Sequence, residues 1–149
     1  MKRGELLSKM IMRATERHAG QFDRGGQPYI LHPLKVMHYL KSDDEELNCI
    51  AVGHDLIEDT GDTFEDLKAE FGQRVAIGIF ILTRQPVESE TVYRERVKVK
   101  KDTVLVKMAD LRHNSDIRRL KGVTQKDIQR MIRYHEFYQE LKMVVGLYE

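Results

Sequence analysis

The sequence has a single cysteine and only three prolines among its 149 residues. Cys49 stands among apolar neighbours, so neither a disulfide framework nor a multi-cysteine zinc site is available. One buried thiol fits a reducing compartment. The N-terminal segment is interrupted by charges every few positions and lacks the apolar core of a signal peptide. These absences predict a soluble, cytoplasmic protein.

An excess of one charge and a long apolar run are also missing. Lysine and arginine number 25 against 24 aspartates and glutamates, which gives a formal net charge of +1. A general nucleic-acid binder usually carries a clearer basic excess, so this class is disfavoured. The longest apolar run, residues 75–82, is too short to cross a bilayer. The length predicts one domain, residues 1–149, whose core needs no disulfide.

What the sequence does contain is helical periodicity. Apolar side chains recur at helical spacing near the N-terminus and predict a first helix over residues 5–18. A loop rich in glycine follows, and Pro33 suits the first turn of a second helix. Further helices are predicted over residues 44–60, 64–72, 74–83, 104–120 and 124–148, whereas residues 90–101 fit either helix or strand. Because no alternating pattern persists, we predict an all-α fold.

The stretch "CIAVGHDLIEDTGD", residues 49–62, places three acids and a histidine at the end of an apolar helix. On a helical wheel His54, Asp55, Glu58 and Asp59 share an arc of roughly 140°. Acids near a helix C-terminus are unfavourable by a few tenths to about 1 kcal/mol each, because they face the negative pole of the dipole. Neighbouring His and Asp residues cannot easily reach one atom from ideal helical positions, so a distorted or terminal turn is expected.

A divalent metal would compensate for these acids. Histidine nitrogen and aspartate oxygen suit manganese, iron or zinc better than calcium. The alternative is a solvated acidic helix end. Two other motifs favour the metal, because "YILHP" sets His32 at a helix start and "VKMADLRHN" sets Asp110 after an apolar run. A site of two histidines and two aspartates would leave positions open for water and substrate, as catalytic metals require; its residues are His32, His54, Asp55 and Asp110.

Together, "HAGQ…GGQPYILHP", "HDLIEDT" and "VLVKMADLRHN" resemble the HD-domain hydrolases of the RelA/SpoT type over residues 10–120. The nearest group is the small alarmone hydrolases of the metazoan SpoT kind. The resemblance implies a compact helical bundle around a manganese ion, and removal of the 3′-pyrophosphate from (p)ppGpp to give GDP or GTP. It implies the four metal ligands named above, Glu58 and Asp59 as the acids that orient and activate the attacking water, and substrate contacts from Arg24 and Asn114.

The glycine-rich loop departs from the family pattern. The family commonly has Arg-Lys where this chain has Asp23 and Arg24. A polyanionic substrate would then need other cations, of which Arg24 and Lys107 are the nearest motif residues. A basic run could serve as a reserve, although a solvated basic face is the preferred interpretation; it comprises Arg94, Arg96, Lys98, Lys100 and Lys101. No synthetase motif follows, so hydrolysis without alarmone synthesis is predicted.

Two other functions stay open at this stage. One is an HD phosphohydrolase acting on an adenosine alarmone, a nucleoside monophosphate or the 2′-phosphate of a dinucleotide. The other is a module that binds nucleotide without turnover, although the presence of every expected ligand and both acids argues against it. His18 is interpreted as a helix cap or a substrate contact, His113 as a neighbour of the site, and Tyr29 as a loop anchor. The oligomeric state does not follow from the sequence.

Overall fold

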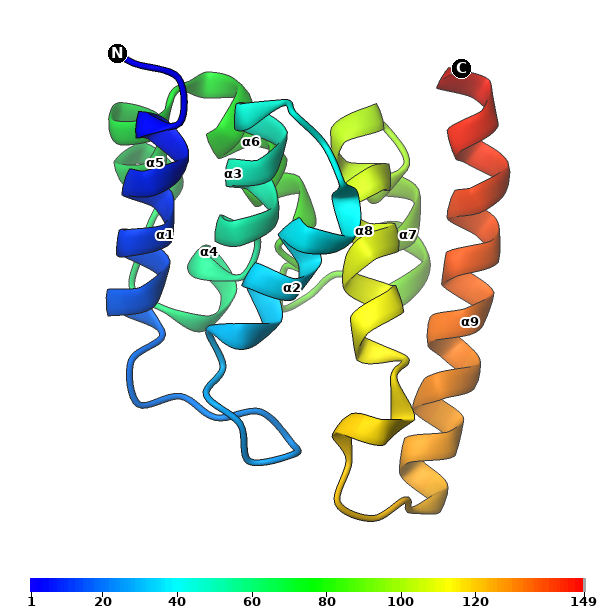
Figure 1. Cartoon of the computed structure of the whole chain (residues 1–149). Coiled ribbons are helices and arrows are strands. Elements are labelled where there is room, and N and C mark those ends of the chain that lie inside the picture. The colour runs from blue at the N-terminus through cyan, green and yellow to red at the C-terminus, as the bar shows by residue number, and fades with distance from the viewer. Residues whose placement is uncertain (149) are drawn as a thin grey trace.

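The computed structural model describes residues 1–148, and its helices form a bundle with the N-terminal helix and the last long helix on opposite sides (Figure 1). Within these residues there is no strand, only an isolated bridge between Phe22 and Pro28. The all-α prediction is confirmed. The elements are α1 (Glu5–Arg17), α2 (Leu31–Leu40), α3 (Glu45–Gly53), α4 (Leu56–Asp59), α5 (Phe64–Phe71), α6 (Gln73–Leu82), α7 (Glu90–Val97), α8 (Lys101–Asn114), η1 (Ile117–Arg119), α9 (Gln125–Val145) and η2 (Gly146–Tyr148).

Helix α3 lies at the centre and packs against α1, α2, α6 and α8. Its Ile50 and Val52 side chains are fully buried. Complete burial of an aliphatic side chain of this size stabilises a fold by about 1.5–3 kcal/mol. Two glycines allow the close approach of neighbouring helices. A Cβ on Gly53 would lie 2.7 Å from Ile79, and one on Gly78 would lie 2.6 Å from Ile50. A side chain at either position would have to displace the neighbouring side chains of Met10, Ile50 or Ile79.

The predicted helix over residues 44–60 is two helices. Asp44 begins α3, because its side chain accepts a hydrogen bond from the backbone N–H of Leu47. The chain leaves helical geometry at Asp55, where φ is −102° and ψ is 1°, and resumes as the single turn α4. The continuous helix was therefore wrong, whereas the distorted turn expected at the His-Asp pair is confirmed.

The ambiguous segment is the helix α7, which begins after Ser89, whose side chain accepts a hydrogen bond from the N–H of Val92. Of the basic run that was interpreted as a solvated face, Arg94, Arg96 and Lys98 form ion pairs with glutamates, whereas Lys100 and Lys101 are exposed. Arg96 donates to the carbonyl oxygens of Phe80, Ile81 and Thr83 at the end of α6. The guanidinium thus supplies donors to carbonyl groups at the C-terminal end of a helix, where intrahelical donors run out.

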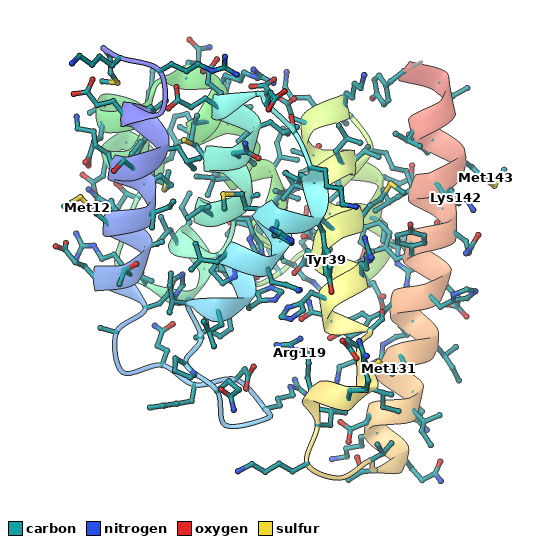
Figure 2. All side chains as sticks on the ribbon, viewed as in Figure 1. Met12, Tyr39, Arg119, Met131, Lys142 and Met143 are labelled. Atoms are coloured by element: carbon teal, nitrogen blue, oxygen red, sulfur yellow. The ribbon has the colours of Figure 1, made fainter. Side chains whose placement is uncertain are left out.

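Helix α9 runs along α8 and closes one side of the bundle (Figure 1). The predicted start is confirmed, since Thr124 and Asp127 form a reciprocal capping box. One face of α9 buries Phe137 and Leu141, while Met143 points away from the bundle (Figure 2). No helix within residues 1–148 combines the length and hydropathy that a membrane span requires.

Candidate active site

Three of the four predicted metal ligands meet at the centre of the bundle. His32 comes from α2, His54 follows α3 and Asp110 comes from α8, and their ligand atoms all lie within 4.8 Å of one another. The Nε2 atom of His32 is 2.9 Å from Oδ1 of Asp110, and Nε2 of His54 is 3.3 Å from the same oxygen. All three side chains are buried. We call these residues, together with Asp55, the His–Asp cluster.

Asp55 reaches the cluster because the chain breaks between α3 and α4. Its Oδ2 atom lies 3.0 Å from Nε2 of His54 and 3.9 Å from Nε2 of His32. The break therefore lets two adjacent residues direct their side chains to one point. Asp55 also lies in a second acidic group, in which carboxylate oxygens of Asp55, Glu58 and Asp59 are within 4.8 Å of one another.

The donor atoms fit a divalent cation. Nδ1 of His54 is 2.7 Å from the carbonyl oxygen of Ala51, which can only accept, so Nδ1 carries the proton in the neutral ring. The other nitrogen, Nε2, is buried and has no hydrogen-bond partner among the residues that the structure describes. Its lone pair faces two carboxylates. Two imidazole nitrogens and two carboxylates suit manganese, iron or zinc.

Protons and a metal would compete for this nitrogen. Burial alone would lower the pKa of His54, but the nearby carboxylates of Asp55 and Asp110 raise it well above its usual value. A metal ligand must be deprotonated, so binding of a cation at Nε2 releases a proton whenever the ring is charged. The cluster is therefore expected to bind metal more weakly as the pH falls.

The other cluster histidine, His32, contacts His113. Nδ1 of His32 lies 2.7 Å from Nδ1 of His113, and the two rings stack. Burial and the Arg119 guanidinium lower the pKa of His113 to about 4, so this ring is neutral and can accept a hydrogen bond from His32. In the neutral ring of His32, this hydrogen bond places the proton on Nδ1 and leaves the lone pair of Nε2 directed at the cluster. His113 thus contacts a cluster residue without belonging to the cluster, which agrees with its interpretation as a neighbour of the site.

Tyr29 has a contact that the sequence did not indicate. Its hydroxyl donates a hydrogen bond to Oδ2 of Asp55, and its ring packs between the rings of His18 and His32. Burial, and then the charge of Asp55, raise the pKa of Tyr29, so the hydroxyl remains a donor. Tyr29 therefore orients a predicted ligand in addition to anchoring the loop. Its position three residues before His32 was the only available signal.

Glu58 and Asp59 lie on α4, one turn beyond the His-Asp pair, and each is partly exposed to solvent. Partial burial and the negative charge of Asp55 raise the pKa of both carboxyl groups. The turn that carries them is tied to the end of α1, because Gln21 donates to the backbone oxygen of Asp59 and contacts Nδ1 of His18 at 2.8 Å. His18 therefore supports the acids through Gln21, as well as ending α1.

Two cavities meet at the cluster. The larger, of about 450 Å³, is walled by the loop between α1 and α2 and by the end of α8, and it includes Arg24 and Asn114. The smaller, of about 270 Å³, lies between the ends of α6 and α7 and the inner face of α9. Both cavities share one wall, formed by Asp55, Glu58, Lys107, Asp110, Arg130 and Tyr134.

Comparison with known proteins agrees with this geometry. The chain is 37% identical over 134 residues to a guanosine-3′,5′-bis(diphosphate) 3′-pyrophosphohydrolase of Haemophilus influenzae, a match that covers 81% of this chain and 19% of the relative. It is also 37% identical over 112 residues to a probable GTP pyrophosphokinase of Mycobacterium leprae, covering 68% of this chain and 14% of that protein. No family model matches.

A solved structure of a metazoan orthologue of SpoT, described as hydrolysing ppGpp, superposes with a TM-score of 0.79 at 20% identity. The match covers 98% of this chain and 94% of that one, which establishes a shared fold. The chain belongs to the RelA/SpoT-type HD-domain family. It spans less than a fifth of the length of the curated relatives named above.

In this HD-domain protein, two predicted substrate residues contact the cluster itself. Nζ of Lys107 is 2.8 Å from Oδ2 of Asp110, and Nδ2 of Asn114 donates to Oδ1 of the same carboxylate at 3.0 Å. Burial would lower the pKa of Lys107, but Asp110 raises it, so the ammonium group stays charged. Lys107 also lies over the rings of Tyr93 and Phe137. Both residues therefore contact Asp110, a predicted metal ligand, in addition to lining a cavity.

The departure of this chain from the family loop has a structural explanation. Asp23 does not present an unpaired charge to the cavity, because Oδ2 accepts a hydrogen bond from Arg119 at 3.1 Å. Its other oxygen accepts from the backbone N–H groups of Gly25 and Gln27. Burial would raise the pKa of Asp23, but these donors lower it. Arg24, which was predicted to contact the substrate, lines the larger cavity.

The last helix supplies cavity residues that sequence reasoning missed. Arg130, Arg133 and Tyr134 of α9 line one or both cavities, and Arg84 lines the smaller one. On α9, Arg133 and Tyr134 follow Arg130 by three and four residues, so the three side chains share one face of the helix. The sequence offered that pattern, but not the fact that this face turns toward the cluster.

Proposed function

We propose that this chain is a metal-dependent hydrolase that removes the 3′-pyrophosphate from (p)ppGpp to give GDP or GTP. The observation that carries the proposal is the convergence of two histidines and two aspartates, with two further acids one turn away. Its relative in Haemophilus influenzae is named for this activity. The alternatives, another nucleotide substrate or binding without turnover, are outcomes of the test below.

The metal is proposed to be manganese, held by His32, His54, Asp55 and Asp110. A bound divalent ion polarises a phosphoryl oxygen and lowers the pKa of a coordinated water. The remaining chemistry belongs to the chain. Tyr29 orients the carboxylate of Asp55, and the neutral ring of His113 keeps Nε2 of His32 available.

Glu58 and Asp59 are proposed to handle the proton of the attacking water. Their raised pKa values make each carboxylate a stronger base than a fully solvated one. Glu58 lies in the shared wall of the two cavities and takes the proton, while Asp59 orients the water. The water oxygen bonds to the phosphorus attached to the ribose 3′ oxygen. The bond to that oxygen breaks, pyrophosphate leaves, and the 3′ oxygen takes up a proton to become a hydroxyl group.

The cavity walls suit a polyanionic nucleotide. Arg24 and Asn114 line the larger cavity, and Arg130 lies in the wall that both cavities share. Neither arginine belongs to the His–Asp cluster or to the acidic group of Asp55, Glu58 and Asp59. They are therefore proposed to contribute mainly to substrate binding, which would appear as an effect on KM.

The test is incubation of metal-free protein with Mn²⁺ and a panel containing ppGpp, pppGpp, an adenosine alarmone, GMP and NADPH, with separation of the products. We expect ppGpp to give GDP and pyrophosphate in equal amounts, with loss of activity in EDTA. Turnover restricted to adenosine nucleotides, GMP or NADPH would replace the proposed substrate. Binding of ppGpp without product would identify a sensing module.

A further inference from the structure

A continuous set of hydrogen bonds links the α1–α2 loop to the His–Asp cluster through Arg119. From these contacts we propose that Arg119 is a positioning residue, which Asp23 holds in place and which sets the orientation of the Asn114 amide and, through it, the Asp110 carboxylate. The proposal rests on the metal site of the proposed function. Neither Arg119 nor its pairing with Asp23 was indicated by the motifs of the sequence.

Arg119 is the last residue of η1, and its guanidinium donates hydrogen bonds both to the α1–α2 loop and to the end of α8 (Figure 2). One terminal nitrogen donates to Oδ2 of Asp23 at 3.1 Å. The other donates to Oδ1 of Asn114 at 3.2 Å and to the backbone oxygen of His113 at 3.1 Å. Only a planar guanidinium presents donors in fixed directions that can satisfy all three acceptors at once.

The α1–α2 loop packs closely against Arg119. Asp23 is largely buried, and its second oxygen accepts two backbone N–H groups, at 2.9 Å each, from Gly25 and Gln27. A Cβ on Gly25 would lie only 2.0 Å from the backbone oxygen of Arg119. A side chain at position 25 would therefore drive the loop away from η1. This close approach fixes the distance between Asp23 and the arginine that it holds.

The Asn114 amide has one orientation that satisfies both of its neighbours. Its oxygen accepts from Arg119, so its nitrogen faces Oδ1 of Asp110 and donates to it at 3.0 Å. The reverse orientation would set an amide oxygen against a carboxylate and an amide NH₂ against a guanidinium. Oδ1 of Asp110 is also the oxygen nearest to both cluster histidines. By donating to the amide oxygen of Asn114, Arg119 thus directs the amide NH₂ group toward the Asp110 carboxylate.

This network gives the acidic residue of the loop a role other than repelling substrate. The charge of Asp23 is matched by Arg119, whose contacts reach the cluster within two hydrogen bonds. Groups hydrogen-bonded to metal ligands typically change metal affinity 10–100-fold when removed. A change at Arg119 should therefore alter metal binding even though the guanidinium is not a ligand.

The experiment is calorimetric titration of Mn²⁺ into metal-free protein, without nucleotide, for wild type, Arg119→Gln, Asn114→Ala and the double variant. Each single variant should bind Mn²⁺ about 10-fold more weakly. The double variant should bind no more weakly than the worse single one, because both changes break the same chain of contacts. Multiplied losses in the double variant would show independent effects and overturn the proposal.

The matched control is Arg118→Gln, the same change at the adjacent position. Arg118 is 86% exposed and pairs only with Asp116 among the described residues. It should leave Mn²⁺ affinity unchanged, and equal losses in Arg118→Gln and Arg119→Gln would reduce the effect to net charge and overturn the proposal. If Arg119→Gln does not fold by circular dichroism, Asp23→Asn decides: weaker Mn²⁺ binding supports the proposal and wild-type affinity contradicts it.

Hydrolysis of ppGpp, measured on the same samples, separates this proposal from the proposed function. If wild type binds Mn²⁺ but releases no pyrophosphate, the proposed function fails, and calorimetry still decides the role of Arg119. If wild type hydrolyses ppGpp and Arg119→Gln binds Mn²⁺ as tightly as wild type, the positioning role fails and the proposed function stands. Absence of Mn²⁺ binding in wild type contradicts both.

Discussion

The His–Asp cluster and the contact between α7 and α9 both concentrate charged side chains, but they are built in opposite ways. Between α7 and α9, Arg94 and Lys98 share the carboxylate of Glu140. At the cluster, Asp55 lies close to Glu58 and Asp59, and none of these three acids forms an ion pair with a lysine or arginine within residues 1–148. The first region is balanced internally, whereas the second is left with negative charge that a cation from solution would neutralise.

This difference separates charge that stabilises the fold from charge that serves chemistry. In the balanced region, ion pairs join two helices, and Glu140 has a lowered pKa because Arg94 and Lys98 outweigh its burial. In the unbalanced region, burial and repulsion raise the pKa values of Glu58 and Asp59. Local strain of this kind is typically retained where function requires it. The following predictions would break or sharpen the contrast, from the largest effect to the smallest.

The largest effect is expected from Asp110→Ala. This change removes a proposed ligand and also leaves the ammonium group of Lys107 buried without its partner. We expect loss of bound manganese and of ppGpp hydrolysis together, as measured by elemental analysis and pyrophosphate release. Asp102→Ala, on the same helix but in a surface network with Arg74, is the control and should retain both. Full manganese occupancy in Asp110→Ala would exclude Asp110 as an essential ligand.

The two acids on α4 should affect turnover more than metal retention. Glu58→Gln and Asp59→Asn should keep the fold and most of the manganese while lowering kcat by about 10²–10⁴-fold, the usual contribution of general acid–base catalysis. Steady-state kinetics with parallel metal analysis makes the distinction. Near-normal kcat in both variants would remove these acids from the chemistry.

The acid limb of the pH–rate profile should report Glu58. The carboxylate is the active form, and burial together with Asp55 and Asp59 raises its pKa. Activity is therefore lost, as the pH falls, at a higher pH than an ordinary glutamate of pKa about 4.3 would give. The profile of kcat is measured at saturating Mn²⁺, since metal binding also weakens in acid. If the residual activity of Glu58→Gln shows the same acid limb as wild type, the titrating group is not Glu58.

The smallest effect is expected in the balanced region. Arg94→Ala removes partly exposed ion pairs with Glu90 and Glu140, which are typically worth about 0.2–1 kcal/mol each. The free energy of unfolding, from urea titration, should fall by an amount of that order. Manganese affinity and kcat should stay at wild-type values, and a large loss of either would show that this region is coupled to the site.

Much of the fold was predictable because it follows from local signals. The capping boxes of α5 and α9 and the periodicity of α1 involve residues close in sequence, and all three helices were predicted. The break between α3 and α4 was predictable only as a distortion. Gly53, at the end of α3, lies against Met10 of α1 and Ile79 of α6, and no local pattern reveals these contacts.

The candidate site divides in the same way. The cluster residues stand in recognisable motifs, and the structure brings His32, His54, Asp55 and Asp110 together. The supporting contacts join distant segments. The hydrogen bonds from Tyr29 to Asp55 and from Arg119 to Asp23 join residues that are far apart in the sequence, so the spacing within a motif could not predict them. Side chains of α9 were missed for the same reason, since their helix was predicted but not the direction of its inner face.

The central claim is that one divalent ion balances the charge of the cluster and enables hydrolysis. The most direct measurement is titration of Mn²⁺ into a known concentration of metal-free protein at saturating ppGpp, at protein concentrations well above the metal dissociation constant, while pyrophosphate release is followed. The account predicts no activity without metal and a linear rise that saturates at one Mn²⁺ per chain. Activity in metal-free protein, or one tightly bound Mn²⁺ per chain with no pyrophosphate released, would contradict it.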